Sequence, residues 1–185
     1  MKYYFLLTVI SAIIFTSCNR KSNLKSIYNC KSDSFSNLET VTDIKKLFSI
    51  EVPKNWKTNL YYDATQTSIY CADTTKQLTE TTLIDVTFIY KPINFTKKFK
   101  EKIHLNTKLY QSIETISREI KVLKKPTFIS ISKGLKQGFP YQKSTIFIRI
   151  NDSNYLLAKI ELYGDSLVKK RFCKAFKLID KIQLK

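Results

Sequence analysis

Hydrophobic and polar residues alternate with a period of two in several short stretches of this chain, which is the pattern of a half-buried β-strand. In the first stretch Phe48, Ile50 and Val52 share one face, and Pro53 ends it because proline cannot donate to a sheet. In the second half, residues 151–154 (Asn-Asp-Ser-Asn) supply a hairpin turn, so an antiparallel meander is predicted there. The predicted strands are 48–52, 67–72, 82–90, 129–131, 146–150 and 156–162.

Two other stretches have the spacing of a helix that is apolar on one face. Leu105, Leu109, Ile113 and Ile116 recur at intervals of four, four and three residues, which predicts a helix crossing one face of the sheet. The lysine-rich segment 97–102 could form the first turns of this helix or a loop.

A second helix is predicted at the end of the chain, with lysines outside its apolar stripe. Asp165 and Ser166 are its predicted N-terminal cap. Its stripe consists of Val168, Phe172, Ala175, Phe176 and Ile179. The order of strands, helix, strands and helix predicts an α+β fold, in which helices pack on an antiparallel sheet.

The N-terminus looks like a bacterial lipoprotein signal peptide over residues 1–17. Lys2 precedes an apolar run that is too short to span a bilayer, and small Ser17 stands before Cys18. Cys18 would become the acylated first residue of the mature protein. Phe15 departs from the usual leucine of the lipobox, but relaxed lipoboxes of Bacteroidota are similar to this one.

The polar residues after Cys18 predict a flexible tether over 18–40, followed by one domain over 41–185. No acidic run follows the anchor, and the segment instead carries Arg20, Lys21 and Lys25. We therefore expect a lipid-anchored protein of the cell envelope, most simply on the periplasmic side of the outer membrane.

The formal net charge is +17, from 32 Lys and Arg against 15 Asp and Glu. Nucleic acid is excluded as the expected partner, because the address is extracytoplasmic, only four of the basic residues are arginine, and no nucleic-acid motif is present. The charge predicts either attraction to the anionic lipid surface or a solvated basic face.

Three further cysteines, Cys30, Cys71 and Cys173, are scattered without a C-x-x-C spacing. An odd number cannot all pair within one molecule, and we expect buried, inert thiols. With His104 as the only histidine, neither a zinc site nor a thioredoxin-like motif is supported, and no metal or cofactor is expected.

No catalytic residue can be assigned from the sequence. A hydrolase triad would depend on His104, no G-x-S-x-G elbow is present, and three glycines are too few for a phosphate-binding loop. Asp63, Asp73 and Asp85 are expected at turns or in a strand, without an acid pair, and Trp56 is expected to cover the core.

The segment FSIEVPKNWK, the strand TTLIDVTFIYKP, the hairpins around ISKGLKQGFPYQKSTIFIRI and NYLLAKIELYG, and the closing amphipathic helix resemble the PsbP-like superfamily. The superfamily includes the photosystem subunit PsbP, the Ran-binding Mog protein and the envelope lipoprotein DcrB. The likeness covers roughly residues 48–182 and implies an α/β/α sandwich around an antiparallel sheet. It transfers no functional residue, because the superfamily has no shared active site.

Three classes of function stay open. The first is a membrane-anchored, non-catalytic binding module for another envelope protein or a ligand. The second is a chaperone or immunity-type lipoprotein that masks a secreted effector, since PsbP-like domains are known as chaperones of such effectors. The third is an enzyme whose site has no recognisable motif.

Overall fold

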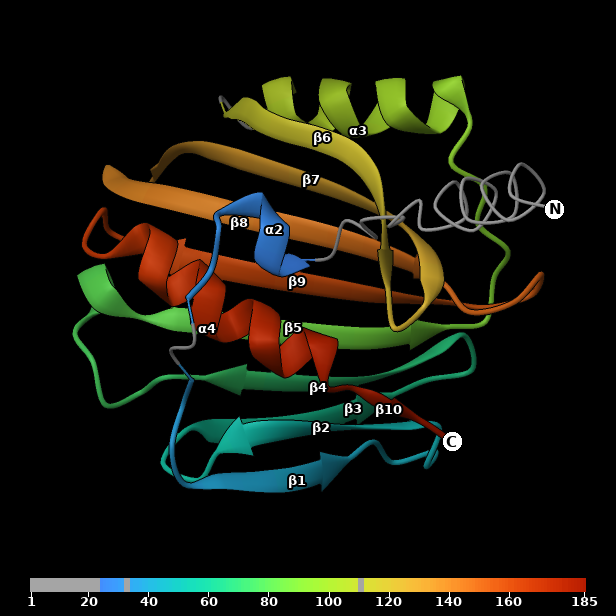
Figure 1. Cartoon of the computed structure of the whole chain (residues 1–185), viewed down its shortest axis with the longest axis horizontal. Helices are drawn as coiled ribbons and strands as arrows, with labels where there is room; N and C mark the ends of the chain where they lie inside the picture. The colour runs from blue at the N-terminus through green and yellow to red at the C-terminus, as the bar shows by residue number, and fades with distance from the viewer. Residues whose placement is uncertain (1–23, 32–33, 110–111) are drawn as a thin grey trace, which may run out of the picture.

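A computed structural model describes residues 24–31, 34–109 and 112–185, and its centre is a large antiparallel sheet (Figure 1). Within the described residues this sheet has seven strands in the order β3-β4-β5-β9-β8-β7-β6. They are β3 (Lys57–Tyr62), β4 (Gln66–Ala72), β5 (Thr82–Ile89), β6 (Ile113–Val122), β7 (Lys125–Lys136), β8 (Phe139–Arg149) and β9 (Tyr155–Tyr163). The predicted antiparallel meander is confirmed as the run β7, β8 and β9, and β6, which was not predicted as a strand, extends it.

A smaller sheet joins the two ends of the described chain. It has the order β1-β2-β10, with β1 (Leu38–Thr42), β2 (Phe48–Pro53) and β10 (Gln183–Leu184). Among the described residues the helical elements are α2 (Leu24–Ile27), the short 3-10 helix η1 (Leu78–Glu80), α3 (Lys97–Leu109) and α4 (Val168–Asp180). The predicted α+β class with helices on an antiparallel sheet is confirmed.

Helix α4 closes the main hydrophobic core against one face of the large sheet (Figure 1). Phe172, Phe176 and Ile179 of its predicted stripe are fully buried. The predicted cap is wrong, because the N-terminal cap residue is Leu167, in a left-handed conformation and without a side-chain hydrogen bond. Neither Asp165 nor Ser166 caps this helix.

The other long helix differs from its prediction. Helix α3 spans Lys97–Leu109, so the lysine-rich segment forms its first turns, and residues 113–122 form strand β6 instead of the end of a helix. The predicted face is also wrong: Leu105 is 59% exposed, whereas Phe99 and Ile103 pack against the sheet. The intervals of four, four and three arose by chance across a helix and a strand.

Part of the predicted tether is packed on the domain. Leu24 of α2 is fully buried, and the Tyr28 ring stacks on Phe172 with centroids 5.7 Å apart. Phe35 meets Trp56 edge to face at 5.1 Å, and Trp56 is buried, as expected for a residue that covers the core. The structure therefore differs from a flexible spacer over these residues.

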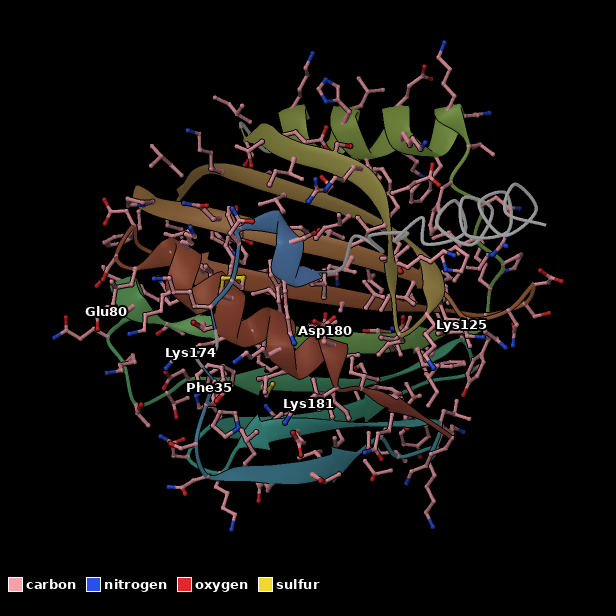
Figure 2. The ribbon with its side chains drawn as sticks, in the orientation of Figure 1. Phe35, Glu80, Lys125, Lys174, Asp180 and Lys181 are labelled. Atoms are coloured by element: carbon pink, nitrogen blue, oxygen red, sulfur yellow. A yellow bond between two sulfur atoms is a disulfide. The ribbon has the colours of Figure 1, made fainter. Side chains whose placement is uncertain are left out.

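A disulfide joins Cys30 to Cys173 of α4, and it is visible as a yellow bond in Figure 2. The prediction of inert thiols is therefore wrong for these two cysteines. It failed because sequence separation, here 143 residues, says nothing about which cysteines meet in the fold. Cys71 is free and buried in the sheet, as predicted.

The predicted signal peptide and Cys18 lie outside the described residues. Within the part of the chain that the structure describes, no helix has both the length and the apolar character needed to cross a membrane.

Candidate functional site

On the sheet face opposite α4, the part that lies under α3 is apolar. In the strand register, Phe128 of β7, Phe147 of β8 and Leu157 of β9 stand side by side on this face. Helix α3 lies on them through Phe99, whose ring is 5.1 Å from that of Phe147 and 5.5 Å from that of Phe128. A small aromatic core therefore fixes α3 to this side of the sheet.

The same face becomes polar two residues further along each strand. Because alternate residues of a strand share a face, the next row is Ser130, Thr145 and Lys159. The row after it is Ser132, Lys143 and Glu161. These rows and the end of α3 enclose a groove of about 440 Å³. Its lining also includes Ile103, Lys136 and Tyr141.

Two of the three lysines in this groove are paired with carboxylates. The Nζ of Lys136 is 3.3 Å from Glu161, and the Nζ of Lys159 is 3.1 Å from Asp85. Lys136 also lies over the ring of Tyr141, 4.9 Å from its centroid. Each of these two ammonium groups therefore has a carboxylate partner, and the third lysine of the lining differs from them.

That cation is Lys143, which is half-buried between the two ion pairs. Among the described residues, no carboxylate oxygen lies within 4.0 Å of its Nζ. Burial lowers the pKa of Lys143, and the positive charges of Lys159 and Lys136 lower it further, while Glu161 opposes the change. The groove therefore holds a partly desolvated ammonium group that lacks a direct counter-ion from the described chain.

The phenols beside these lysines do not supply acid-base groups near neutral pH. Burial raises the pKa of Tyr141 and of Tyr70, and the charge of Glu161 raises both further. Both phenols are therefore protonated at neutral pH, and that of Tyr141 hydrogen-bonds Glu161.

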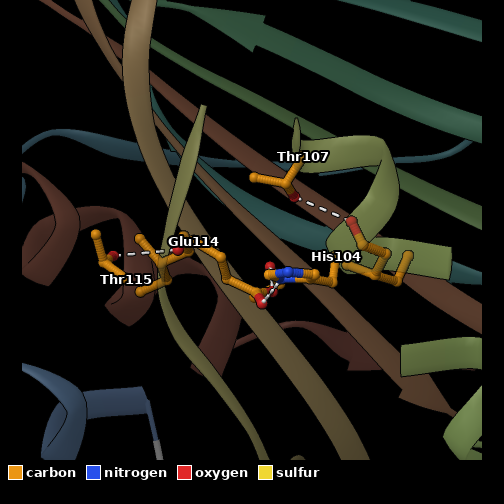
Figure 3. Close-up of polar contacts among 7 residues, drawn as sticks. His104, Thr107, Glu114 and Thr115 are labelled. Atoms are coloured by element: carbon orange, nitrogen blue, oxygen red, sulfur yellow. Dashed lines mark hydrogen bonds and ion pairs between the residues drawn. The ribbon is translucent and has the colours of Figure 1, made fainter. Parts of the chain in front are cut away.

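His104, the only histidine, meets Glu114 of β6 (Figure 3). Its Nδ1 is 3.1 Å from Glu114 Oε2, while Ser130 Oγ donates to Glu114 Oε1 at 2.5 Å. The carboxylate stands between the serine and the imidazole, so the imidazole cannot take the serine proton directly. This arrangement orients Glu114 and does not form a hydrolase triad.

The other residues considered from the sequence have structural roles. Asp63 and Asp73 accept hydrogen bonds from the turns that follow them, as expected, and Asp85 pairs with Lys159. Burial raises the pKa of Cys71 to about 12, which makes it a poor nucleophile. In residues 24–31, 34–109 and 112–185, no group of three or more metal-ligating side chains comes together.

The groove could not be predicted because Lys159 and Glu161 lie on the polar side of the predicted strand 156–162, while Tyr141, Lys143 and Thr145 lie before the predicted start of strand 146–150. Lys159, Glu161 and Tyr163 alternate with the core residues of β9, and Tyr141, Lys143 and Thr145 do so in β8. Charged and aromatic side chains at every second position of these two strands indicate a face that is partly covered and not simply exposed to solvent. Only the pairing of the strands places the two sets side by side.

The fold is of the PsbP and Mog1 type. A point mutant of the protein Mog1 superposes with a TM-score of 0.55 at 9% sequence identity, over 80% of this chain and 96% of Mog1. The Ran-binding protein Mog1p of Saccharomyces cerevisiae gives the same TM-score and identity over 81% of this chain and 96% of its own. Cyanobacterial PsbP (CyanoP) of Synechocystis sp. PCC 6803 has a TM-score of 0.52 at 10% identity, covering 84% of this chain and 97% of CyanoP.

A protein from Bacteroides thetaiotaomicron VPI-5482 also superposes, with a TM-score of 0.50 at 11% identity. The match covers 81% of this chain and 49% of that protein. A search with protein-family models gives no match for this chain, and neither does a comparison with curated protein sequences. At these identities the likeness establishes the fold alone.

Proposed function

We propose that this protein is a non-catalytic binding module of the bacterial cell envelope, anchored by a lipid on Cys18 and facing the periplasm from the outer membrane. It holds another envelope protein or a small ligand in the groove between α3 and the sheet. The observation that carries this proposal is the groove itself. There, hydroxyls, a phenol and a half-buried lysine without a counter-ion among the described residues converge beside apolar side chains.

Two further observations support the proposed location. The sequence around Cys18 has the features of a lipoprotein signal. The Cys30–Cys173 disulfide suits an oxidising compartment such as the bacterial periplasm, because cytosolic thiols are kept reduced.

The non-catalytic character is supported by the groove chemistry and by the fold. Ser130 donates to the Glu114 carboxylate and not to His104, so these three residues lack the order of a Ser-His-acid triad. The yeast neighbour Mog1p is described as Ran-binding, so this fold presents protein-binding surfaces elsewhere.

The anchor is tested by acyl labelling of the full-length protein in its cells. Wild type should incorporate a labelled fatty acid and sediment with membranes, whereas Cys18→Ala should do neither. Membrane attachment that persists in Cys18→Ala contradicts the proposed anchor. Protease treatment of intact cells should leave the domain uncut, and digestion would contradict the periplasmic orientation.

The groove is tested by filling it. Ser132→Trp adds a large side chain to the groove lining, while Lys133→Trp adds the same side chain at the next residue, on the opposite face of β7. Ligands and proteins retained by the membrane-extracted wild type should be lost from Ser132→Trp and kept by Lys133→Trp. Equal retention by all three proteins would show that binding does not use the groove.

A further inference from the structure

We propose that the groove binds a small organic anion, with an apolar body against Phe147 and Leu157 and a carboxylate at the Nζ of Lys143. This inference rests on the proposed function, because it names the ligand class of the same groove.

The polarity of the groove changes in one direction along the strands. At one end lie Phe147, Leu157 and Ile103 of α3, which offer apolar contact. Two and four residues along β8 stand Thr145 and Lys143, which offer a hydroxyl and an ammonium. A ligand that satisfies both ends must itself be apolar at one end and polar at the other.

The charge of the polar end favours an anion. The groove lining carries Lys136, Lys143 and Lys159 against Glu161, and Asp85 balances Lys159 from the neighbouring strand β5. Glu114, which accepts from the lining residue Ser130, brings the formal charges to three of each sign, so the position that favours an anion is the local one at Lys143. The half-buried ammonium of Lys143 has no carboxylate oxygen within 4.0 Å among the described residues, so an incoming carboxylate would offset its lost hydration.

The hydroxyls beside Lys143 can complete the coordination of a carboxylate. Ser132 stands opposite Lys143 in the strand register, and Thr145 is the next residue of β8 on the same face. A carboxylate has about four acceptor positions, so it can accept from both hydroxyls and the ammonium together.

The size of the groove limits the ligand to a small molecule. Its volume of about 440 Å³ falls in the lower part of the usual range for small-molecule sites, roughly 300 to 1,000 Å³. A chain of six to ten carbons with one carboxylate has suitable proportions, and octanoate is a convenient probe.

The test uses isothermal titration calorimetry with the purified protein and four probes: octanoate, octan-1-ol, octylamine and inorganic phosphate. Octanoate should bind, octan-1-ol should bind at least about tenfold more weakly, and octylamine and phosphate should not bind measurably. Equal binding of octanoate and octan-1-ol would overturn the role of the charge. Binding of phosphate as strong as that of octanoate would overturn the role of the apolar end.

Two matched variants locate the charge. Lys143→Gln should lose at least about tenfold in octanoate affinity, while Lys133→Gln, which removes an exposed lysine of β7 on the other face, should stay within about twofold. Unchanged affinity in Lys143→Gln overturns the inference. Because Lys143→Gln removes a partly desolvated charge, its thermal midpoint should not fall, which separates lost binding from lost folding.

The failure of this inference differs from the failure of the proposed function. If no probe binds but native ligands or proteins are still lost from Ser132→Trp, the groove binds something other than an organic anion. If no probe binds and Ser132→Trp retains everything that wild type retains, both proposals fail.

Discussion

The two faces of the large sheet are built differently, although the same strands supply both. On the α4 face, each of the strands β4, β5, β7, β8 and β9 contributes buried aliphatic residues to one continuous core. On the α3 face, a small aromatic cluster gives way after one row to lysines, hydroxyls and carboxylates. The α4 face therefore carries the main core, whereas the α3 face combines a small aromatic core with a polar groove.

This difference explains why the two helices were not equally predictable. Helix α4 buries nearly all of its apolar stripe, so its periodicity is strong. Helix α3 touches the sheet mainly through Phe99 and Ile103, and Leu105 points to solvent. A helix that buries only one narrow edge leaves a weak pattern, and chance spacing can outweigh it.

The largest effect is expected on the α4 face. Phe172→Ala together with Phe176→Ala should give an unfolded or insoluble protein, because each truncation of a fully buried phenylalanine costs about 3 to 5 kcal/mol. A typical domain is stabilised by only roughly 5 to 15 kcal/mol. Lys169→Ala on the exposed side of the helix should leave the urea unfolding curve nearly unchanged. A soluble double variant that melts cooperatively would show that the α4 face does not carry most of the stability.

The disulfide should be the next largest contribution to the same face. Replacing Cys30 and Cys173 together by alanine should lower the free energy of unfolding by about 2 to 5 kcal/mol, because the long closed loop restricts the unfolded chain. Urea unfolding with and without a reductant measures this. The reductant should lower the stability of the wild type and leave that of the double variant unchanged. A wild type whose stability does not change with the reductant would contradict the presence of the disulfide.

On the α3 face a single truncation should be milder. Phe99 is half-buried against Phe128 and Phe147, so Phe99→Ala should cost about 2 kcal/mol and leave the protein folded. Leu105→Ala on the outer side of α3 should change the stability by less than about 0.5 kcal/mol. Thermal melts of both variants check which side of α3 packs, and the reverse order of effects would contradict the structure.

The smallest effect should come from a carboxyl at the end of α4. Burial raises the pKa of Asp180 to about 6, and the charge of Lys25 opposes this only in part. Because the pKa is higher in the folded state, Asp180 favours folding below about pH 4, and this contribution is lost as the pH rises through about 6.

Asp180→Asn should therefore be more stable than wild type by about 1 kcal/mol at pH 8, with the difference disappearing near pH 4. Urea unfolding at both pH values measures the difference. Asp152→Asn, in the exposed hairpin turn, serves as the control and should show no such pH dependence. A destabilised Asp180→Asn at pH 8 would contradict the burial of this carboxyl.

The sequence was sufficient for the parts of the fold that depend on local periodicity. Strands such as 48–52 and 82–90 and the stripe from Phe172 to Ile179 could be predicted because one face of each is buried. Strand β6 and the Cys30–Cys173 bond could not, since each depends on distant residues brought together by folding. The cap at Leu167 could not either, because it uses no side-chain hydrogen bond that a residue type would indicate.

For the candidate site, the residue types were visible and their assembly was not. Lys143 and Lys159 come from different strands, and only the register of β8 on β9 puts them in one groove. That Lys143 lacks a counter-ion among the described residues is a property of three-dimensional neighbours that no spacing along the chain encodes.

The Cys30–Cys173 bond also has a mechanical consequence. If the protein is anchored at Cys18 as proposed, force applied from the membrane reaches the domain through the segment that contains Cys30. The disulfide then transmits this force directly to the middle of α4. Strands β1 and β2 follow Cys30 in the chain, so they lie outside this path of force and are not pulled apart one residue at a time. The force instead reaches α4, whose apolar stripe is buried in the main core, so tension on a partner bound in the groove would not separate the N-terminal strands from the domain.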